Sequence, residues 1–160
     1  MILVFLFTFA RLNNLLIQFH SWKVIIHQPC LLIEQANQKP LYMAMEQTVQ
    51  IALFLDNFKV KIGIWGVIFR NDRQKNTQTL ADLEISVNDV KEILADLAIE
   101  DYSEGPLPEI FYGGSEMWVF GRVIKSHEIY IKITLGLPSN PTICISFHGA
   151  EFPMTYPLRV

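Results

Sequence analysis

Apolar residues in this chain change their spacing once, from a helical repeat in the first part to alternation in the last part. The helical spacing predicts helices over 46–64, 76–83 and 87–97. The third helix has the clearest beginning, because Ser86 precedes it and Asp89 lies three positions further on, which is the spacing of a capping box. We therefore expect helices to come first in the domain.

Alternating apolar and polar residues over 117–124, 128–135 and 142–148 predict three strands. The glycines and prolines of 101–115 predict a loop between the helices and these strands. Helices followed by hairpin-connected strands are the order expected of an α+β domain. We expect N-terminal helices packed on a small C-terminal antiparallel β-sheet.

Composition fits a single domain in a reducing compartment. The chain has 160 residues and is 51% hydrophobic, which is enough for one core. Its two cysteines, Cys30 and Cys144, have neither zinc-ligand nor disulfide-framework spacing, so we expect a cytoplasmic protein without a structural metal. The formal net charge of −3 argues against a protein that coats DNA, and we expect no DNA binding by this chain alone.

Residues 1–44 contain only four of the 29 charged side chains, whereas 45–160 contain the other 25. The apolar run over 1–10 has no basic residue before it and no cleavage site after it, so we do not interpret it as a signal peptide. Arg11 and nearby asparagines interrupt any bilayer-spanning window, so we expect no membrane segment, with an anchor as the alternative. We interpret 45–160 as one domain and 1–44 as an N-terminal extension, with a translation start at Met43 or Met45 as the alternative.

Several side chains that can transfer protons or bind anions lie on the polar face of the predicted sheet. Facing residues of antiparallel strands point to the same side of a sheet. If the connection between the last two strands closes symmetrically, Lys132 faces Ser146 and Tyr130 faces His148. The shorter connection before them then brings Arg122 opposite Tyr130. The polar side of the last strand is predicted to consist of Cys144, Ser146 and His148.

A row of Arg122, Tyr130 and His148 flanked by Lys132 predicts a ribonuclease site that uses neither a metal nor another cofactor. Cleavage by the substrate's own 2′-hydroxyl needs a base, an acid and fixed positive charge on the phosphate. Histidine titrates near neutral pH, so His148 is the expected proton-transfer residue, with Tyr130 as its partner at the phosphate. Lys132 and Arg122 form the expected electrostatic clamp.

The same sheet has plainer interpretations. Trp118 and Phe120 share the parity of Arg122, so they are either substrate-binding residues that stack on unpaired bases or core residues under the first helix or the 101–115 loop. Polar side chains on the outer face are also what any half-solvated antiparallel sheet displays. His127 is expected to be a solvated turn residue.

Four segments, 97–103, 117–120, 128–134 and 145–148, resemble the toxins of the motility quorum-sensing regulator (MqsR) family. The sharpest element is Tyr-x-Lys-x-Thr, followed by a strand that ends in Ser-Phe and a basic residue, and the resemblance covers roughly 54–150. It implies a bacterial type II toxin with a RelE-like α+β fold. Such a toxin is an RNA-binding endoribonuclease, or mRNA interferase, held inactive by a cognate antitoxin with a zinc-binding domain.

The match to the family differs among individual residues. Tyr130 matches the strand tyrosine of the family, whereas His148 and Glu104 each stand where the family has a lysine, and Met117 stands near a family glutamine. These differences leave open a non-catalytic interaction module or an inactive toxin relative. A carboxylate from Glu104 or Glu151 beside His148 would orient its ring.

Charge is separated along the domain. Residues 82–116 hold ten acidic side chains and one basic side chain, whereas 117–148 hold three basic and one acidic. This separation predicts that the sheet is the RNA-binding face and that the acidic part docks a basic partner. The plainer interpretation is that the acidic side chains solvate a helix and a loop.

Overall fold

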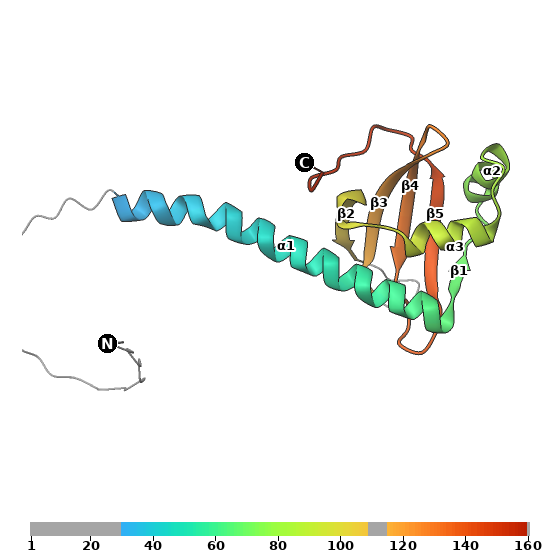
Figure 1. Ribbon diagram of the computed structural model, residues 1–160, viewed down its shortest axis with the longest axis horizontal. Coiled ribbons are helices and arrows are strands. Elements are labelled where there is room, and N and C mark those ends of the chain that lie inside the picture. Colours follow the sequence, from blue (N-terminus) through green and yellow to red (C-terminus); the bar gives the residue numbers. More distant parts are fainter. Residues whose placement is uncertain (1–29, 109–114, 160) are drawn as a thin grey trace, which may run out of the picture.

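The computed structural model describes residues 30–108 and 115–159 and shows an α+β fold (Figure 1). This confirms the predicted fold class. The helices are α1 (Cys30–Trp65), α2 (Gln74–Asp82), α3 (Val87–Ala95) and the short 3-10 helix η1 (Ile99–Asp101). The strands are β1 (Val67–Phe69), β2 (Tyr102–Leu107), β3 (Met117–Ile124), β4 (His127–Thr134) and β5 (Thr142–Gly149).

The strands form one five-stranded sheet in the order β1-β5-β4-β3-β2. β1 runs parallel to β5, and all other neighbours are antiparallel. The three predicted strands are confirmed as β3, β4 and β5, and the three predicted helices as α1, α2 and α3. The capping box of α3 is also confirmed, because Ser86 Oγ accepts from the Asp89 amide at 3.2 Å and the Asp89 carboxylate accepts from the Ser86 amide at 2.6 Å.

Helix α1 begins at Cys30, before its predicted start, and passes unbroken through the boundary placed between 44 and 45. Figure 1 shows its first half extending beyond the edge of the sheet and its second half lying across the sheet. In the second half, buried side chains run from Ile51 to Ile62. The apolar run considered as a leader or anchor lies outside the described residues. Among the described residues, none of the helices combines the length and apolarity that crossing a bilayer requires.

The core lies between the sheet and the helices α1 and α3. Phe54 of α1 stacks on Trp118 of β3 with ring centroids 4.9 Å apart. Ile129, Ile131 and Ile133 of β4 are almost completely buried, in agreement with the alternation of apolar and polar residues over 128–135. Each such side chain contributes about 1.5–3 kcal/mol by leaving water, so this burial fixes the helices on one face of the sheet.

Two strands correct the sequence prediction. The loop predicted over 101–115 is wrong in its first part, because Tyr102–Leu107 forms the edge strand β2. Gly105 and Pro106 coincide there with register shifts against β3 instead of a turn. The three-residue strand β1 was missed because it is too short for alternation to show. Residues 109–114 of the predicted loop lie outside the described residues.

The predicted polar side of β5 is wrong at Cys144. Lys132 faces Ser146, but the next residue of β4, Ile133, faces Cys144, so β5 has one extra residue between the two pairs. This β-bulge changes which residues face the helices, and Cys144 lies fully buried in the core. Burial raises the pKa of its thiol far above the ordinary value, which keeps the sulfur protonated.

Candidate functional site

Tyr130 of β4 and His148 of β5 are cross-strand neighbours on the sheet face opposite the helices, called the outer face here. Their rings are nearly parallel, at 20°, with centroids 5.2 Å apart. Lys132 faces Ser146, and its ammonium lies 5.7 Å from the centroid of the Tyr130 ring. Both predicted cross-strand pairs are therefore confirmed, and they bring a phenol, an imidazole and an ammonium together.

The imidazole of His148 is partly exposed and is held by the adjacent backbone. Its Nδ1 lies 2.9 Å from the carbonyl oxygen of Gly149. A carbonyl oxygen can only accept a hydrogen bond, so Nδ1 carries the hydrogen and donates it. Nε2 is then the nitrogen that takes a proton in the neutral ring and gives one in the charged ring.

These side chains line a cavity of about 470 Å³ on the outer face, called the sheet cavity here. Tyr130, Lys132 and His148 lie on its floor, and β2 contributes Glu104 to one wall. Another wall is formed by 150–155, which follow β5. Figure 1 shows this C-terminal segment, 150–159, folding back across the sheet, and we call it the C-terminal strap. The volume is that of an ordinary ligand site.

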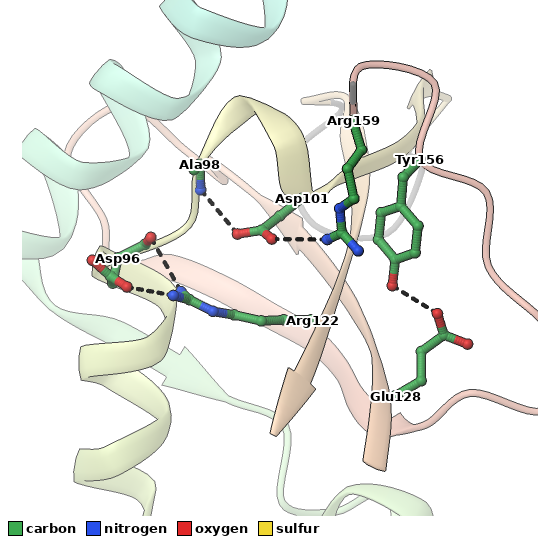
Figure 2. A network of polar contacts seen from close by, with 7 residues as sticks. All are labelled: Asp96, Ala98, Asp101, Arg122, Glu128, Tyr156 and Arg159. Carbon is green, nitrogen blue, oxygen red and sulfur yellow. Dashed lines mark hydrogen bonds and ion pairs between the residues drawn. The ribbon is translucent and has the colours of Figure 1, made fainter. Parts of the chain in front are cut away.

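Two carboxylates hold the C-terminal strap (Figure 2). The Tyr156 hydroxyl donates to Glu128 of β4 at 2.8 Å, and Arg159 approaches Asp101 at 3.5 Å. Burial and the bond to Glu128 raise the pKa of Tyr156 to about 12. Gly121 of β3 permits this close approach, because a Cβ there would lie 2.5 Å from the Tyr156 hydroxyl oxygen.

Glu151 of the C-terminal strap brings a carboxylate toward His148. It forms an ion pair with Lys75 of α2, and this pairing lowers the pKa of Glu151. The charge of His148 acts in the same direction, as a smaller cause. Glu104 and Glu151 both line the sheet cavity, and Glu151 interacts electrostatically with the ring of His148.

Helix α2 reaches the site because its Asn76 takes the place of a strand. β1 pairs with β5 only as far as Cys144. Beyond that point, the buried side chain of Asn76 donates to the Ile145 carbonyl at 3.2 Å and accepts from the Phe147 amide at 3.0 Å. These two bonds continue the hydrogen bonding of β5 and fix the first turn of α2 beside His148.

Arg122 is not part of the site, which corrects the predicted clamp. Gly121 occupies the position opposite Tyr130, and Arg122 lies on the helix-facing side. Its guanidinium bonds the carboxylate of Asp96 at 2.5 Å and the carbonyl of the same residue at 3.1 Å (Figure 2). The error arises in the turn, where residues 125 and 126 both have positive φ, at 47° and 67°, and form a two-residue hairpin connection.

Trp118 and Phe120 are core residues, so their predicted role in base stacking is wrong. They are 3% and 0% exposed, and Phe54 of α1 stacks against both rings. The alternative that they pack under the first helix is confirmed. His127 is exposed, as expected, with Nδ1 2.9 Å from the carbonyl oxygen of Lys125, but it is the first residue of β4 and not part of the turn that precedes it.

Sequence reasoning missed Arg73, Lys75 and Asn76. Asn76 was predicted to begin the second helix, over 76–83, and neither it nor Arg73 or Lys75 was given a role at the site. No local pattern indicates that this segment packs against a strand about 70 residues later. A buried asparagine in an otherwise polar segment has no periodic signature. Its role appears only when β5 is in place.

In 30–108 and 115–159, no three His, Cys, Asp or Glu side chains are grouped so that they could hold a metal ion. The chain matches no protein-family model, no curated protein and no solved structure. Function is therefore inferred from the geometry of the site and from the sequence resemblance.

Proposed function

We propose that this chain is the toxin of a type II toxin–antitoxin system and a metal-independent endoribonuclease that cleaves messenger RNA. The observation that carries the proposal is the stacked pair of Tyr130 and His148 on the floor of the sheet cavity. Lys132 supplies a positive charge within the same cavity. The resemblance to MqsR toxins supports the toxin class and a cognate antitoxin as the partner.

In the proposed reaction, the substrate's 2′-hydroxyl attacks the adjacent phosphorus. Nε2 of neutral His148 takes the proton of this hydroxyl as the new oxygen–phosphorus bond forms. The bond from phosphorus to the 5′-oxygen breaks, and Tyr130 gives its hydroxyl proton to that leaving oxygen. The products are a 2′,3′-cyclic phosphate and a 5′-hydroxyl. The Tyr130 phenolate then recovers a proton from the His148 imidazolium, which restores both groups.

Lys132 stabilises the charge that builds on the phosphate oxygens during this step. Among the described residues that line the sheet cavity, it is the only lysine or arginine. Because Arg122 faces the helices, the predicted clamp is reduced to this ammonium on the floor of the cavity.

The test measures RNA cleavage by His148→Ala and Tyr130→Phe in the presence of EDTA, which removes contaminating metal-dependent nucleases. General acid–base catalysis contributes about 10²–10⁴-fold, so each variant should lose activity on that scale. His127→Ala is the matched control, because His127 is also bonded through Nδ1 to a carbonyl but lies at the first position of β4, beside the turn, and lines none of the described cavities near the site. It should cleave RNA as the unmodified protein does. Undiminished cleavage by both site variants would remove the proposed site.

A non-catalytic interaction module is the second candidate function. Glu104 favours it, because a carboxylate in the sheet cavity repels phosphate and attracts a basic protein segment. A neighbouring gene for a small protein with cysteines at zinc-finger spacing would favour the toxin. Growth arrest on expression of the chain, relieved by co-expression of that neighbour, would separate the two functions.

A further inference from the structure

A second cavity adjoins the sheet cavity on the side of α2. It has a volume of about 440 Å³, and we call it the α2 cavity. Ser146 and His148 line both cavities, so the two meet along β5. The remaining lining residues are Arg73, Gln74, Lys75 and Asn76.

The two cavities differ in charge. The sheet cavity is lined by one cation, Lys132, and by two carboxylates, Glu104 and Glu151. The α2 cavity is lined by Arg73 and Lys75, and no aspartate or glutamate is among its described lining residues. Fixed positive charge beside the candidate site is therefore concentrated in the α2 cavity.

The two cations of the α2 cavity differ in their ion pairing. Among the described residues, the guanidinium of Arg73 has no carboxylate at ion-pair distance. Lys75 pairs with Glu151 at an exposed position, where both side chains are more than half accessible to water. An exposed pair of this kind is weak, so a phosphate can replace the carboxylate at Lys75.

We propose that the α2 cavity binds the RNA backbone phosphate next to the scissile one. The inference rests on the proposed function, which places the scissile phosphate at Tyr130 and His148. Because His148 lines both cavities, a strand positioned there continues into the α2 cavity. The planar guanidinium of Arg73 matches two phosphate oxygens, and Lys75 adds a point charge once it leaves Glu151.

The experiment measures binding of a fluorescent 2′-O-methyl RNA oligonucleotide as a function of salt, because this sugar lacks the attacking hydroxyl. Each phosphate contact on a single strand adds about 0.7 to the slope of log affinity against log salt. Arg73→Ala should lower this slope by about 0.7 and weaken binding at low salt by about fivefold. Glu151→Gln should act in the opposite direction and tighten binding, because it frees Lys75.

Two controls separate this effect from a general loss of charge or of folding. Arg73→Lys keeps the charge and should retain most of the slope. Lys91→Ala removes an exposed cation on α3 that lines neither cavity, and it should bind as the unmodified protein does. If Arg73→Ala keeps the full slope, the inference is overturned. It is also overturned if Arg73→Ala weakens binding of a polyglutamate peptide and not of RNA.

The outcomes also separate this inference from the proposed function. Cleavage by the unmodified protein together with an unchanged slope in Arg73→Ala would remove the phosphate subsite and leave the ribonuclease. If the unmodified protein never cleaves RNA, no scissile phosphate lies at Tyr130 and His148. The α2 cavity then cannot bind the phosphate next to it, even if Arg73 contributes to RNA binding.

Discussion

The two faces of the sheet are built from the same alternating strands and are held in different ways. On the helix-facing side, Phe54 stacks on Trp118 and the isoleucines of β4 are fully buried, so contact is broad and apolar. On the outer face, Tyr130, Lys132 and His148 border an open cavity. Its surroundings are fixed by a few directional bonds, to Asn76 on one side and to the C-terminal strap on the other.

The difference indicates where the molecule tolerates change. An apolar core accepts substitutions that conserve volume, because dispersion contacts have no strict direction. A hydrogen bond at a buried edge has no such freedom, since an unmatched partner keeps its desolvation cost. The structure of the outer face should therefore depend on fewer residues than that of the core. Substitution of each of these residues should change stability separately.

Asn76→Ala should give the largest loss of stability. The side chain is 1% exposed and bonds the Arg70 carbonyl at 2.8 Å as well as the Ile145 carbonyl and the Phe147 amide. Its loss leaves buried backbone groups without partners at about 1–3 kcal/mol each, so we expect a fall of about 3 kcal/mol in the free energy of unfolding. Urea denaturation measures it.

Thr77→Ala is the matched control for this substitution. Its hydroxyl bonds the Gln74 carbonyl at an exposed position of the same helix, so its removal should change stability by less than about 0.5 kcal/mol. If Asn76→Ala unfolds like Thr77→Ala, the outer face is not held at β5 by this amide, and the contrast with the core disappears.

Gly121→Ala should have the next largest effect, and it acts on the opposite border of the sheet cavity. The added methyl would lie 2.5 Å from the Tyr156 hydroxyl oxygen and 2.7 Å from Met154 Sδ, so the C-terminal strap must shift. Overpacking costs about 1–3 kcal/mol, and we expect about 2 kcal/mol. Gly149→Ala is the control, because a Cβ at Gly149 meets nothing within 4 Å.

Hydrogen exchange localises the change. The Met154 amide donates to Glu128 at 3.4 Å, and its exchange should accelerate in Gly121→Ala and not in Gly149→Ala. If exchange at Met154 stays as slow as in the unmodified protein, the C-terminal strap does not depend on the absence of a side chain at 121. The outer face would then tolerate substitutions as well as the core does.

The pairing of Tyr130 with His148 could be predicted from the sequence because both strands alternate clearly and their connection has recognisable turn residues. The same reasoning failed at Cys144, on the other side of the bulge. One extra residue in β5 reverses the alternation, and nothing in the sequence of 142–149 marks where that residue lies. The register was therefore right on one side of the bulge only.

A single error in the β3–β4 turn misplaced Arg122, Trp118 and Phe120 together. Residues of one parity share a face, so a shift of one position moves all of them across the sheet. The contributions of Asn76 and of the C-terminal strap could not be predicted from the sequence for another reason. They are contacts between segments distant in sequence, and local periodicity carries no information about them.

Tyr156→Phe should give the smallest effect, and it tests the C-terminal strap through pH. The folded-state pKa of Tyr156 is raised to about 12, whereas a tyrosine in the unfolded chain titrates near 10. Below about pH 10 the phenol is protonated in both states, and its bond to Glu128 should stabilise the fold by about 1 kcal/mol. Between about pH 10 and 12 the unfolded state loses this proton and the native state keeps it, so stability falls as pH rises.

The substitution removes this titration and leaves the other four tyrosines of the chain in place. The stability difference between the unmodified protein and Tyr156→Phe should therefore be largest near neutral pH and shrink above about pH 10. Urea denaturation at about pH 8 and about pH 11 measures the difference. A difference that is constant across this range would mean that the phenol is not held in its protonated form by Glu128 and burial. The C-terminal strap would then be held by Arg159 and by apolar contact. Apolar contact is also what holds the helix-facing side of the sheet.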